Sequence, residues 1–328
     1  MIPYKIDFAY ARFLTKFVNN GIFPCRFPSR AESQKGNMNI LVTGANGQLG
    51  TELRNVTAGS HDNYIFTDVT SLPGIETINL DITDIDAVRI VCESDSIDVI
   101  VNCAAYTDVD KAEDDPSKAT LINCTAAGNL AKVAAERNAA LIHISTDYVF
   151  HGDVPMPCKE DWPTDPSGVY GSTKLAGERA IRESGCRSII FRTAWLYSPY
   201  GKNFVKTMLR LTAEKDSIKV VFDQIGTPTY AHDLASLIVR IIDGNQLEKT
   251  GTYHFSNEGA VSWYDFAEAI REISGNDCDI RPCHTEEYPS KACRPRFSVL
   301  DKTKVKSTFG ITIPYWRESL KDCIERMK

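Results

Sequence analysis

The chain has 328 residues, of which 43% are hydrophobic and 24% are charged, and its formal net charge is −6. An acidic balance without a long basic run gives no electrostatic footprint for nucleic acid, and no window holds the ~18 consecutive apolar residues of a membrane-spanning helix. This length permits one large domain or two modest ones, with enough chain for a sizeable core.

The ten cysteines give no sign of a disulfide framework. None belongs to a C-x-x-C pair, and several, such as Cys103, lie inside apolar runs, where cysteine serves as a small core residue. We therefore expect reduced thiols and a cytoplasmic location. One loose group has spacings that match no familiar zinc pattern, so unrelated thiols are the favoured interpretation and no metal site is predicted; its members are Cys278, Cys283, His284 and Cys293.

The first 37 residues differ from the rest of the chain. They combine apolar positions with scattered charges and lack the unbroken apolar core of a signal peptide. Their last part is turn-rich and basic, and every motif described below begins at or after Met38. We expect residues 1–37 to be a dispensable N-terminal extension.

From Met38, short apolar runs alternate with amphipathic stretches. We expect buried strands over residues 39–44, 64–68, 77–81, 98–105, 140–146 and 187–193. We expect helices over residues 51–56, 85–93, 115–137 and 168–184. Strands without polar alternation that are separated by helices are typical of a parallel sheet covered on both faces. The prediction is therefore an α/β fold with a Rossmann-type doubly wound parallel sheet.

The alternation loosens after Tyr197. Residues 218–223 and 251–255 still look like strands, whereas the helices near 203–213, 262–274 and 315–327 do not alternate with strands in the same way, and another helix is expected near 231–242. We predict an NAD(P)-binding Rossmann domain over residues 38–197 and 218–256, with a smaller, interleaved C-terminal substrate-binding lobe over 198–217 and 257–328. Ligands of such sheets bind beyond the carboxyl ends of the strands, so the site is expected there.

A glycine-rich segment follows the first strand directly. Gly44, Gly47 and Gly50 lie in V-T-G-A-N-G-Q-L-G with the spacing G-x-x-G-x-x-G. Glycine permits a tight turn and lets backbone N–H groups approach a pyrophosphate at a helix N-terminus. A glycine-rich turn without a ligand is the alternative, but the position between the first strand and the first helix favours a dinucleotide site.

Residues after three strands complete the expected cofactor site. Asp68 ends the second strand, 24 residues after Gly44, where an acidic residue often binds the adenosine ribose. Such a carboxylate disfavours a 2′-phosphate and no arginine stands beside it in the sequence, so NADH is favoured; an Asp that only caps a turn is an equally weighted alternative. Asp81 is placed to accept from an adenine amino group, and Ala104 and Ala105 are small enough for a cofactor to approach the backbone.

The fifth strand ends in hydroxyls, and a tyrosine and a lysine follow four residues apart. Thr146 ends H-I-S-T, and Tyr170 and Lys174 lie in V-Y-G-S-T-K, about one helix turn apart on one face. A nearby ammonium lowers the pKa of a phenol, so we expect Tyr170 to give its proton to a carbonyl oxygen as a hydride arrives at carbon. Thr146 would donate a second hydrogen bond to that oxygen. The pattern Y-x-x-x-K alone occurs by chance in many helices; its order after the glycine loop and the Ser/Thr strand end favours catalysis.

Seven motifs together resemble the extended short-chain dehydrogenase/reductase family. They are G-A-N-G-Q-L-G, N-C-A-A-Y-T-D-V-D-K-A-E, S-T-D-Y-V-F, Y-G-S-T-K-L-A-G-E, F-R-T-A-W-L-Y, N-F-V-K-T-M-L and D-Q-I-G-T-P-T. Within this family they are similar to reductases of dTDP-linked 4-keto-6-deoxysugars, which supply precursors of bacterial surface polysaccharides. The resemblance covers Met38 to the C-terminus and implies an NADPH- or NADH-dependent enzyme that acts on a dTDP-sugar, with a homodimer as an assembly to expect.

The resemblance also implies roles for individual residues. Thr146, Tyr170 and Lys174 would be the catalytic trio, with Tyr170 and Lys174 also contacting the cofactor. The other implied cofactor-binding residues are Gly47, Gln48 and Leu49 at the pyrophosphate, Asp81 and Ile82 at the adenine, and Ala105, Tyr106 and Thr107 on the inner side. The implied substrate-binding residues are Thr146, Asp147 and Trp195 at the sugar, and Asn203 and Arg294 at the diphosphate. Glu52 matches one position of a magnesium site known in family members, but no ligand set can be completed around it.

The residue after the Thr-Asp pair bears on the type of reaction. A sugar-nucleotide 4,6-dehydratase needs an acid and a base beside the threonine, typically Asp then Glu, whereas here Thr146 and Asp147 are followed by Tyr148. Simple carbonyl reduction is therefore favoured over elimination. Two alternatives stay open. One is a related nucleotide-sugar 4-ketoreductase or epimerase, and the other is a non-catalytic, cofactor-binding regulatory subunit, against which the intact trio argues.

Overall fold

The computed structural model describes residues 37–288 and 290–328. The predicted N-terminal extension, residues 1–37, lies outside this part of the chain except for its last residue. Residues Met38–Lys328 form one structural unit. Within the described ranges, no helix combines the length and apolar character needed to cross a membrane.

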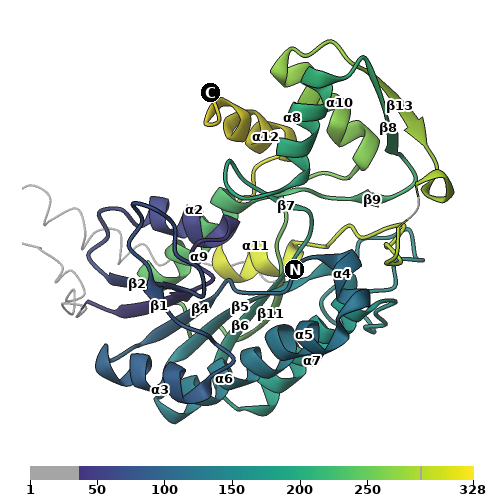
Figure 1. The fold of residues 1–328 in the computed structure, drawn as a ribbon. Coiled ribbons are helices and arrows are strands. Elements are labelled where there is room, and N and C mark those ends of the chain that lie inside the picture. The colour runs from purple at the N-terminus through teal and green to yellow at the C-terminus, as the bar shows by residue number, and fades with distance from the viewer. Residues whose placement is uncertain (1–36, 289) are drawn as a thin grey trace, which may run out of the picture. The chain divides into compact units, whose positions relative to one another are not determined.

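A parallel sheet of seven strands organises this unit, as Figure 1 shows. Its order is β11-β6-β5-β4-β1-β2-β3, and every pair of neighbours is parallel. The strands are β1 (Asn39–Thr43), β2 (Asn63–Asp68), β3 (Ile78–Asn79), β4 (Val99–Asn102), β5 (Ala140–Thr146), β6 (Arg187–Thr193) and β11 (Gly251–His254). The chain runs outward from β1 to β3 and then returns through β4 to the other side, so the predicted doubly wound α/β fold is confirmed.

Helices cover both faces of the sheet, which explains the unbroken apolar strands. In β1, Ile40 and Val42 are buried with the helices on one face, and Leu41 is buried with those on the other. The first face carries α2 (Gln48–Val56), α9 (Ala231–Asp243) and α11 (Thr303–Phe309). The second face carries α3 (Ile85–Ser94), α6 (Ala126–Glu136) and α7 (Val169–Glu183).

Two predicted elements end or divide differently from the pattern of apolar residues. The fourth strand stops at Asn102 instead of residue 105, because the Asn102 side chain accepts from Ala104 N–H and turns the chain out of the strand. The predicted helix over 115–137 is interrupted. It consists of α5 (Pro116–Thr120), a π-helical turn (Leu121–Thr125) and α6, preceded by α4 (Val109–Asp114). Single π turns of this kind often lie at functional sites.

A second lobe has its own apolar core. Helices α8 (Phe204–Glu214), α10 (Trp263–Ser274) and α12 (Trp316–Glu325) pack there with β8 (Ser217–Val221), which pairs with β13 (Asp279–Cys283). The remaining short pairs are β7 (Leu196–Tyr197) with β10 (Thr229–Tyr230), and β9 (Ile225–Gly226) with β12 (Val261–Ser262). The chain passes between the main sheet and this lobe more than once. Strand β8, which the prediction placed in the Rossmann domain, pairs with β13 inside the lobe. The exact domain boundaries stay a proposal.

Candidate active site

The glycine loop links the end of β1 to α2 and lies against the segment after β4. Gly44 has φ +64°, and a Cβ there would lie 2.5 Å from the backbone nitrogen of Ala104. Only glycine fits both the left-handed backbone and this close approach. Gly47 is the N-cap of α2 and no side chain caps the helix start, so the N-terminal end of the helix dipole is presented at this loop.

The side chains of Gln48 and Leu49 are already used within the protein. The Gln48 carboxamide oxygen accepts from Asn203 Nδ2 at 2.9 Å and from Ser198 Oγ at 3.2 Å. Leu49 is buried in the core. Their predicted contact with a pyrophosphate would therefore come from backbone N–H groups. Asn203 also donates to backbone carbonyls and accepts from Lys206 N–H, so its side chain caps α8 and ties the second lobe to the glycine loop.

Asp68 has the capping role that the sequence left as an alternative. Its Oδ1 accepts from the backbone N–H and hydroxyl of Thr70, and its Oδ2 accepts from Asn46 N–H at 3.1 Å. No arginine is next to Asp68 in the sequence, but the fold links one to it. Arg54 donates to Thr77, Thr77 donates to Asn46, and Asn46 N–H donates to Asp68. The predicted preference for NADH therefore loses half of its argument, and the ribose contact stays a prediction.

The remaining predicted cofactor residues follow β3 and β4. Asp81 uses one carboxylate oxygen to accept from Thr83, Ile82 beside it is buried, and Ala104 and Ala105 are half-buried. Tyr106 is held by Asn123 in the π-helical turn, which accepts from Tyr106 N–H at 2.8 Å and donates to its carbonyl at 3.1 Å. Thr107, the next residue, is exposed. The sequence had no signal for Asn123, which is far from any motif.

The structure brings the catalytic trio together at the carboxyl end of β5. Thr146 is the last residue of that strand and hydrogen-bonds with Tyr170, the second residue of α7. A Cβ at Gly171 would lie 2.2 Å from the carbonyl oxygen of Tyr148, so a glycine beside Tyr170 lets α7 approach the strand end. Lys174 follows one turn later and is 1% exposed. The predicted juxtaposition is thus present.

The pKa of Tyr170 is raised in this structure, whereas the sequence predicted a pKa lowered by the nearby ammonium. Burial raises the pKa of Tyr170 to about 12, and the hydrogen bond from Thr146 offsets only part of this rise. Lys174 Nζ donates to the Ile144 carbonyl at 2.6 Å, toward the sheet. Burial lowers the pKa of Lys174 itself to about 8, against the attraction of Glu178. The phenol therefore stays protonated at neutral pH, as a proton donor must.

Tyr148 and Arg294 stand beside the catalytic tyrosine. The rings of Tyr148 and Tyr170 meet edge to face with centroids 5.4 Å apart. Arg294 hydrogen-bonds with the Tyr148 hydroxyl and donates to Asp110 Oδ2 at 2.7 Å. Arg294 therefore reaches the catalytic end of the sheet from a distant part of the chain, where an anionic part of a substrate would meet it.

Trp195 holds an unusual backbone conformation at the edge of the second lobe. Its φ is +48°, which is rare for a bulky residue, and its indole stacks on that of Trp263 with ring centroids 3.5 Å apart. Bulky residues with a left-handed backbone conformation are often found at functional sites. Trp263 was not predicted, because its sequence surroundings indicate only the start of an amphipathic helix.

Asp147 is a buried carboxyl between the trio and the second lobe. It is 2% exposed, its Oδ1 accepts from Thr146 Oγ1 at 3.0 Å, and its Oδ2 has no hydrogen-bond partner. Burial raises the pKa of Asp147 to about 6, against hydrogen bonds from Ser298 and Thr146. This carboxyl therefore changes charge close to neutral pH, next to the predicted sugar-binding position.

We expect Asp147→Asn to be more stable than the wild type above pH 6, by about 1–2 kcal/mol. The folded-state pKa of Asp147 is raised, so its contribution to stability is full below the unfolded pKa and is lost as pH rises through about 6. The neutral amide avoids that loss. Urea unfolding at pH 5 and pH 8 measures the difference, with the 82%-exposed Asp165, as Asp165→Asn, for control. A variant less stable than wild type at pH 8 would contradict the expectation.

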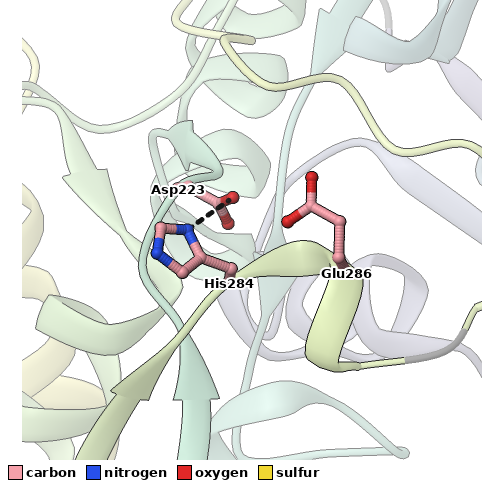
Figure 2. A group of neighbouring side chains, drawn as sticks. All are labelled: Asp223, His284 and Glu286. Atoms are coloured by element: carbon pink, nitrogen blue, oxygen red, sulfur yellow. Dashed lines mark ion pairs between the residues drawn. The ribbon is translucent and has the colours of Figure 1, made fainter.

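One group of possible metal ligands among the described residues includes His284, and its members already have partners within the protein. Figure 2 shows Asp223, His284 and Glu286, whose ligand atoms lie within 4.8 Å of one another; this is the candidate group found among the described residues. Asp223 already accepts from the N–H and hydroxyl of Thr285, and Glu286 lies 3.7 Å from Arg296. None of the three suspected cysteines belongs to this group.

Glu52 gives the magnesium expectation no support. Its buried carboxylate accepts from the Arg326 guanidinium at 3.0 Å and lies 3.2 Å from His232 Nδ1. A carboxylate that is paired with two basic groups serves to join α2 to α9 and the C-terminal end of the chain. Both contacts are made by Oε2, whereas Oε1 is buried and has no hydrogen-bond partner among the described residues.

Comparison with known proteins gives consistent results. The model of the RmlD substrate-binding domain family matches residues 38–328. A dTDP-4-dehydrorhamnose reductase from Aggregatibacter actinomycetemcomitans is 42% identical over 292 residues, which cover 86% of this chain and 97% of that protein. The region before Met38 lies outside the family match.

Two solved structures share the fold at similar identity. A dTDP-4-dehydrorhamnose reductase from Clostridium acetobutylicum has a TM-score of 0.83 and 42% identity, covering 88% of this chain and 99% of its own. One from Bacillus anthracis, crystallised in complex with NADP, has a TM-score of 0.83 and 38% identity, with the same coverage of 88% and 99%.

Proposed function

The chain belongs to the RmlD substrate-binding domain family, and on this basis we propose that it is an NAD(P)H-dependent reductase of the dTDP-rhamnose pathway. It reduces the C4 ketone of dTDP-4-dehydro-L-rhamnose and yields dTDP-L-rhamnose for surface polysaccharide synthesis. The observation that carries the proposal is the meeting of Thr146, Tyr170 and Lys174 at the carboxyl end of β5, in the same parallel sheet whose strand β1 ends in the glycine loop.

The protein's own residues manage the proton and the developing charge. A nicotinamide bound at this site would supply the hydride for C4. Tyr170 would give its phenolic proton to the carbonyl oxygen, so that the ketone becomes an alcohol. Thr146 donates a hydrogen bond where negative charge develops. Lys174 carries positive charge close to the tyrosine while its pKa of about 8 keeps it mostly protonated at neutral pH. Bulk solvent then restores the proton of Tyr170 before the next turnover.

We propose that both NADPH and NADH are used. The glycine loop and the start of α2 would hold the pyrophosphate through backbone N–H groups. Asp68 favours a free ribose hydroxyl, whereas Arg54, three hydrogen bonds away through Asn46 and Thr77, offers a cation for a 2′-phosphate. Comparing kcat/KM for the two cofactors in Asp68→Asn and Arg54→Gln tests the assignment. The first change should shift preference toward NADPH and the second toward NADH.

We propose that Arg294 binds the diphosphate of the substrate. Replacing it by lysine keeps the charge but removes the planar fork, so the KM for the dTDP-sugar should rise about tenfold with a smaller change in kcat. Arg296→Lys is the matched control, because Arg296 is 73% exposed and has only a long contact with Glu286. Equal effects of the two replacements would remove Arg294 from the binding site.

The reaction is tested by supplying dTDP-4-dehydro-L-rhamnose with NADPH or NADH and identifying the product by NMR. Formation of dTDP-L-rhamnose with stoichiometric cofactor oxidation is the expected result. A product of opposite configuration at C4 would favour a related 4-ketoreductase, and sugar conversion without net cofactor oxidation would favour an epimerase. Cofactor oxidation only after another protein is added would favour a regulatory subunit.

We also propose a cytoplasmic location and a homodimer. The cysteines within the described ranges are free thiols, which supports a reducing compartment. Light scattering of the purified protein measures the assembly directly.

A further inference from the structure

A chain of buried polar groups crosses the sheet beneath the catalytic helix. Lys174 Nζ lies 3.5 Å from His143 Nε2, and His143 Nδ1 lies 2.9 Å from Asn102 Nδ2. Asn102 Oδ1 accepts from Thr43 Oγ1 at 2.7 Å. The four side chains come from α7 and from the adjacent strands β5, β4 and β1, and each residue is 1% exposed. Apart from Lys174, none of them has a part in the reaction described above.

The orientation of the Asn102 amide follows from a backbone donor. Ala104 N–H lies 3.1 Å from Asn102 Oδ1, and a backbone N–H can only donate, so the atom facing it must be the amide oxygen. The NH₂ group of Asn102 therefore faces His143. An amide NH₂ also only donates, so His143 Nδ1 must accept and carries no proton.

The remaining ring nitrogen of His143 then carries the proton. Burial lowers the pKa of His143 well below its ordinary value, with a smaller effect of Lys174 in the same direction, so the ring is neutral and has one N–H. That N–H is on Nε2 and is directed at Lys174 Nζ. Because Nε2–H is a donor, an ammonium proton of Lys174 cannot point at Nε2. The Ile144 carbonyl instead accepts from Nζ, at 2.6 Å, in another direction.

We propose that His143 is a positioning residue that Asn102 holds as the Nε2–H tautomer, and that this N–H opposes the ammonium form of Lys174 and turns its protons away from the His143 ring, toward the Ile144 carbonyl. The catalytic consequence deepens the proposed function and rests on it, whereas the tautomer does not. His143 thus acts on Tyr170 only through Lys174 and touches neither substrate nor cofactor.

The charged groups around Lys174 are compatible with this role. On α7, Glu178 lies one turn further and favours the ammonium, but its carboxylate is shared with Arg192 of β6 and with Arg182. Directly after β4, burial raises the pKa of the Cys103 thiol, which therefore carries no charge. Tyr170, one turn earlier on α7, is neutral as well. On the sheet side, Nζ therefore meets two polar groups: the Ile144 carbonyl, which accepts from it, and the His143 N–H, which opposes it.

The first experiment reads the tautomer in the cofactor-free protein. Nitrogen-15 NMR of protein labelled at its six histidines distinguishes Nδ1–H from Nε2–H and from the charged ring. We expect one histidine that stays the neutral Nε2–H form from pH 8 down to about pH 5. That resonance is assigned as the one that is lost in His143→Gln. A His143 ring in the Nδ1–H form, or one that titrates near pH 6.5, would overturn the proposal.

The variant Asn102→Asp should reverse the tautomer of His143. A carboxylate can accept from Ala104 N–H with one oxygen and from His143 Nδ1–H with the other, so Nε2 becomes an acceptor for Lys174. We expect the resonance of His143 to change to Nδ1–H, and the pH at which kcat falls on the alkaline side to rise by about one unit. Retention of the Nε2–H form would refute the role of Asn102, even if kcat changes.

The matched control is Asn79→Asp, which adds the same charge on the exposed strand β3 and should leave both readings unchanged. An alkaline limb that stays in place in Asn102→Asp while the tautomer changes would separate His143 from Lys174 and overturn the catalytic part of the proposal. If the wild type fails to reduce the dTDP-sugar, the proposed function fails, but the NMR result still decides the tautomer.

Discussion

Replacing Tyr170 by phenylalanine is expected to lower kcat by roughly 10²–10⁴-fold while cofactor binding is retained. The change removes the hydroxyl that gives its proton to the substrate oxygen. The ring itself remains and keeps its edge-to-face contact with Tyr148. Oxidation of NADPH in the presence of dTDP-4-dehydro-L-rhamnose measures kcat, and fluorescence titration measures the Kd of the cofactor.

Tyr148→Phe is the matched control for this prediction. It removes the hydroxyl of the neighbouring ring. That hydroxyl hydrogen-bonds with Arg294, whereas the Tyr170 hydroxyl hydrogen-bonds with Thr146. Its kcat should fall by less than about tenfold, because no proton is transferred from Tyr148. Comparable rates for wild type and Tyr170→Phe would mean that the proton comes from another donor.

The pH dependence of kcat in the wild type tests the protonation states of Tyr170 and Lys174. The Tyr170 pKa of about 12 keeps the phenol protonated through the working range, so tyrosine ionisation should not cause a decline below pH 10. The Lys174 pKa of about 8 predicts that kcat falls on the alkaline side as the ammonium is lost. An activity that is flat from pH 7 to pH 9.5 would argue against a charged Lys174 in the reaction.

Replacing Arg192 by methionine is expected to lower the free energy of unfolding by ~3–5 kcal/mol at pH 8. Arg192 donates two hydrogen bonds, at 2.9 and 2.8 Å, to the carboxylate of Glu178, whose side chain is 0% exposed. Methionine fills similar space but leaves a buried carboxylate without its principal cation. Urea unfolding followed by circular dichroism measures the loss.

Arg182→Met isolates the effect of burial. Arg182 also pairs with Glu178, at 2.6 Å, but its side chain is 45% exposed, so its removal should cost less than about 1 kcal/mol. The double variant Arg192→Met with Glu178→Gln should recover much of the loss, because no buried charge remains. A double variant as unstable as Arg192→Met alone would assign the loss to packing.

The loss in Arg192→Met should also depend on pH. Burial alone would raise the pKa of Glu178, but in the wild type the hydrogen bond and charge of Arg192 hold it below its ordinary value. The pair therefore stabilises the protein above the unfolded pKa of Glu178, and this contribution is lost as pH falls through the folded pKa. In the variant Glu178 takes up a proton, so the deficit should shrink toward pH 5.

The sequence was sufficient for the fold where apolar residues alone decide the structure. The strands β1, β4, β5 and β6 are buried on both faces, so their composition is nearly uniform and easily recognised. Their ends were less predictable. The apolar run after Val99 continues to Ala105, but the strand stops at Asn102, because a side-chain hydrogen bond replaces a backbone one.

The site was predictable where chemistry follows a fixed spacing and not where it depends on tertiary contacts. Thr146, Tyr170 and Lys174 meet as predicted. The predicted direction of the Tyr170 pKa was wrong, because the burial that raises it belongs to the folded chain only. Trp263 was missed for the same reason: nothing near it in the sequence shows that it stacks on Trp195.

The Asn123 side chain has a consequence for how this sequence can change over time. It holds both backbone polar groups of Tyr106 on the cofactor side, and it donates to Thr173 Oγ1 at 3.2 Å on the helix that carries Tyr170 and Lys174. The segment that is predicted to line the cofactor and the helix that carries Tyr170 and Lys174 therefore take their spacing from one amide. Positions 106, 123 and 173 should be inherited as a set, and replacing one alone should misalign hydride and proton delivery together.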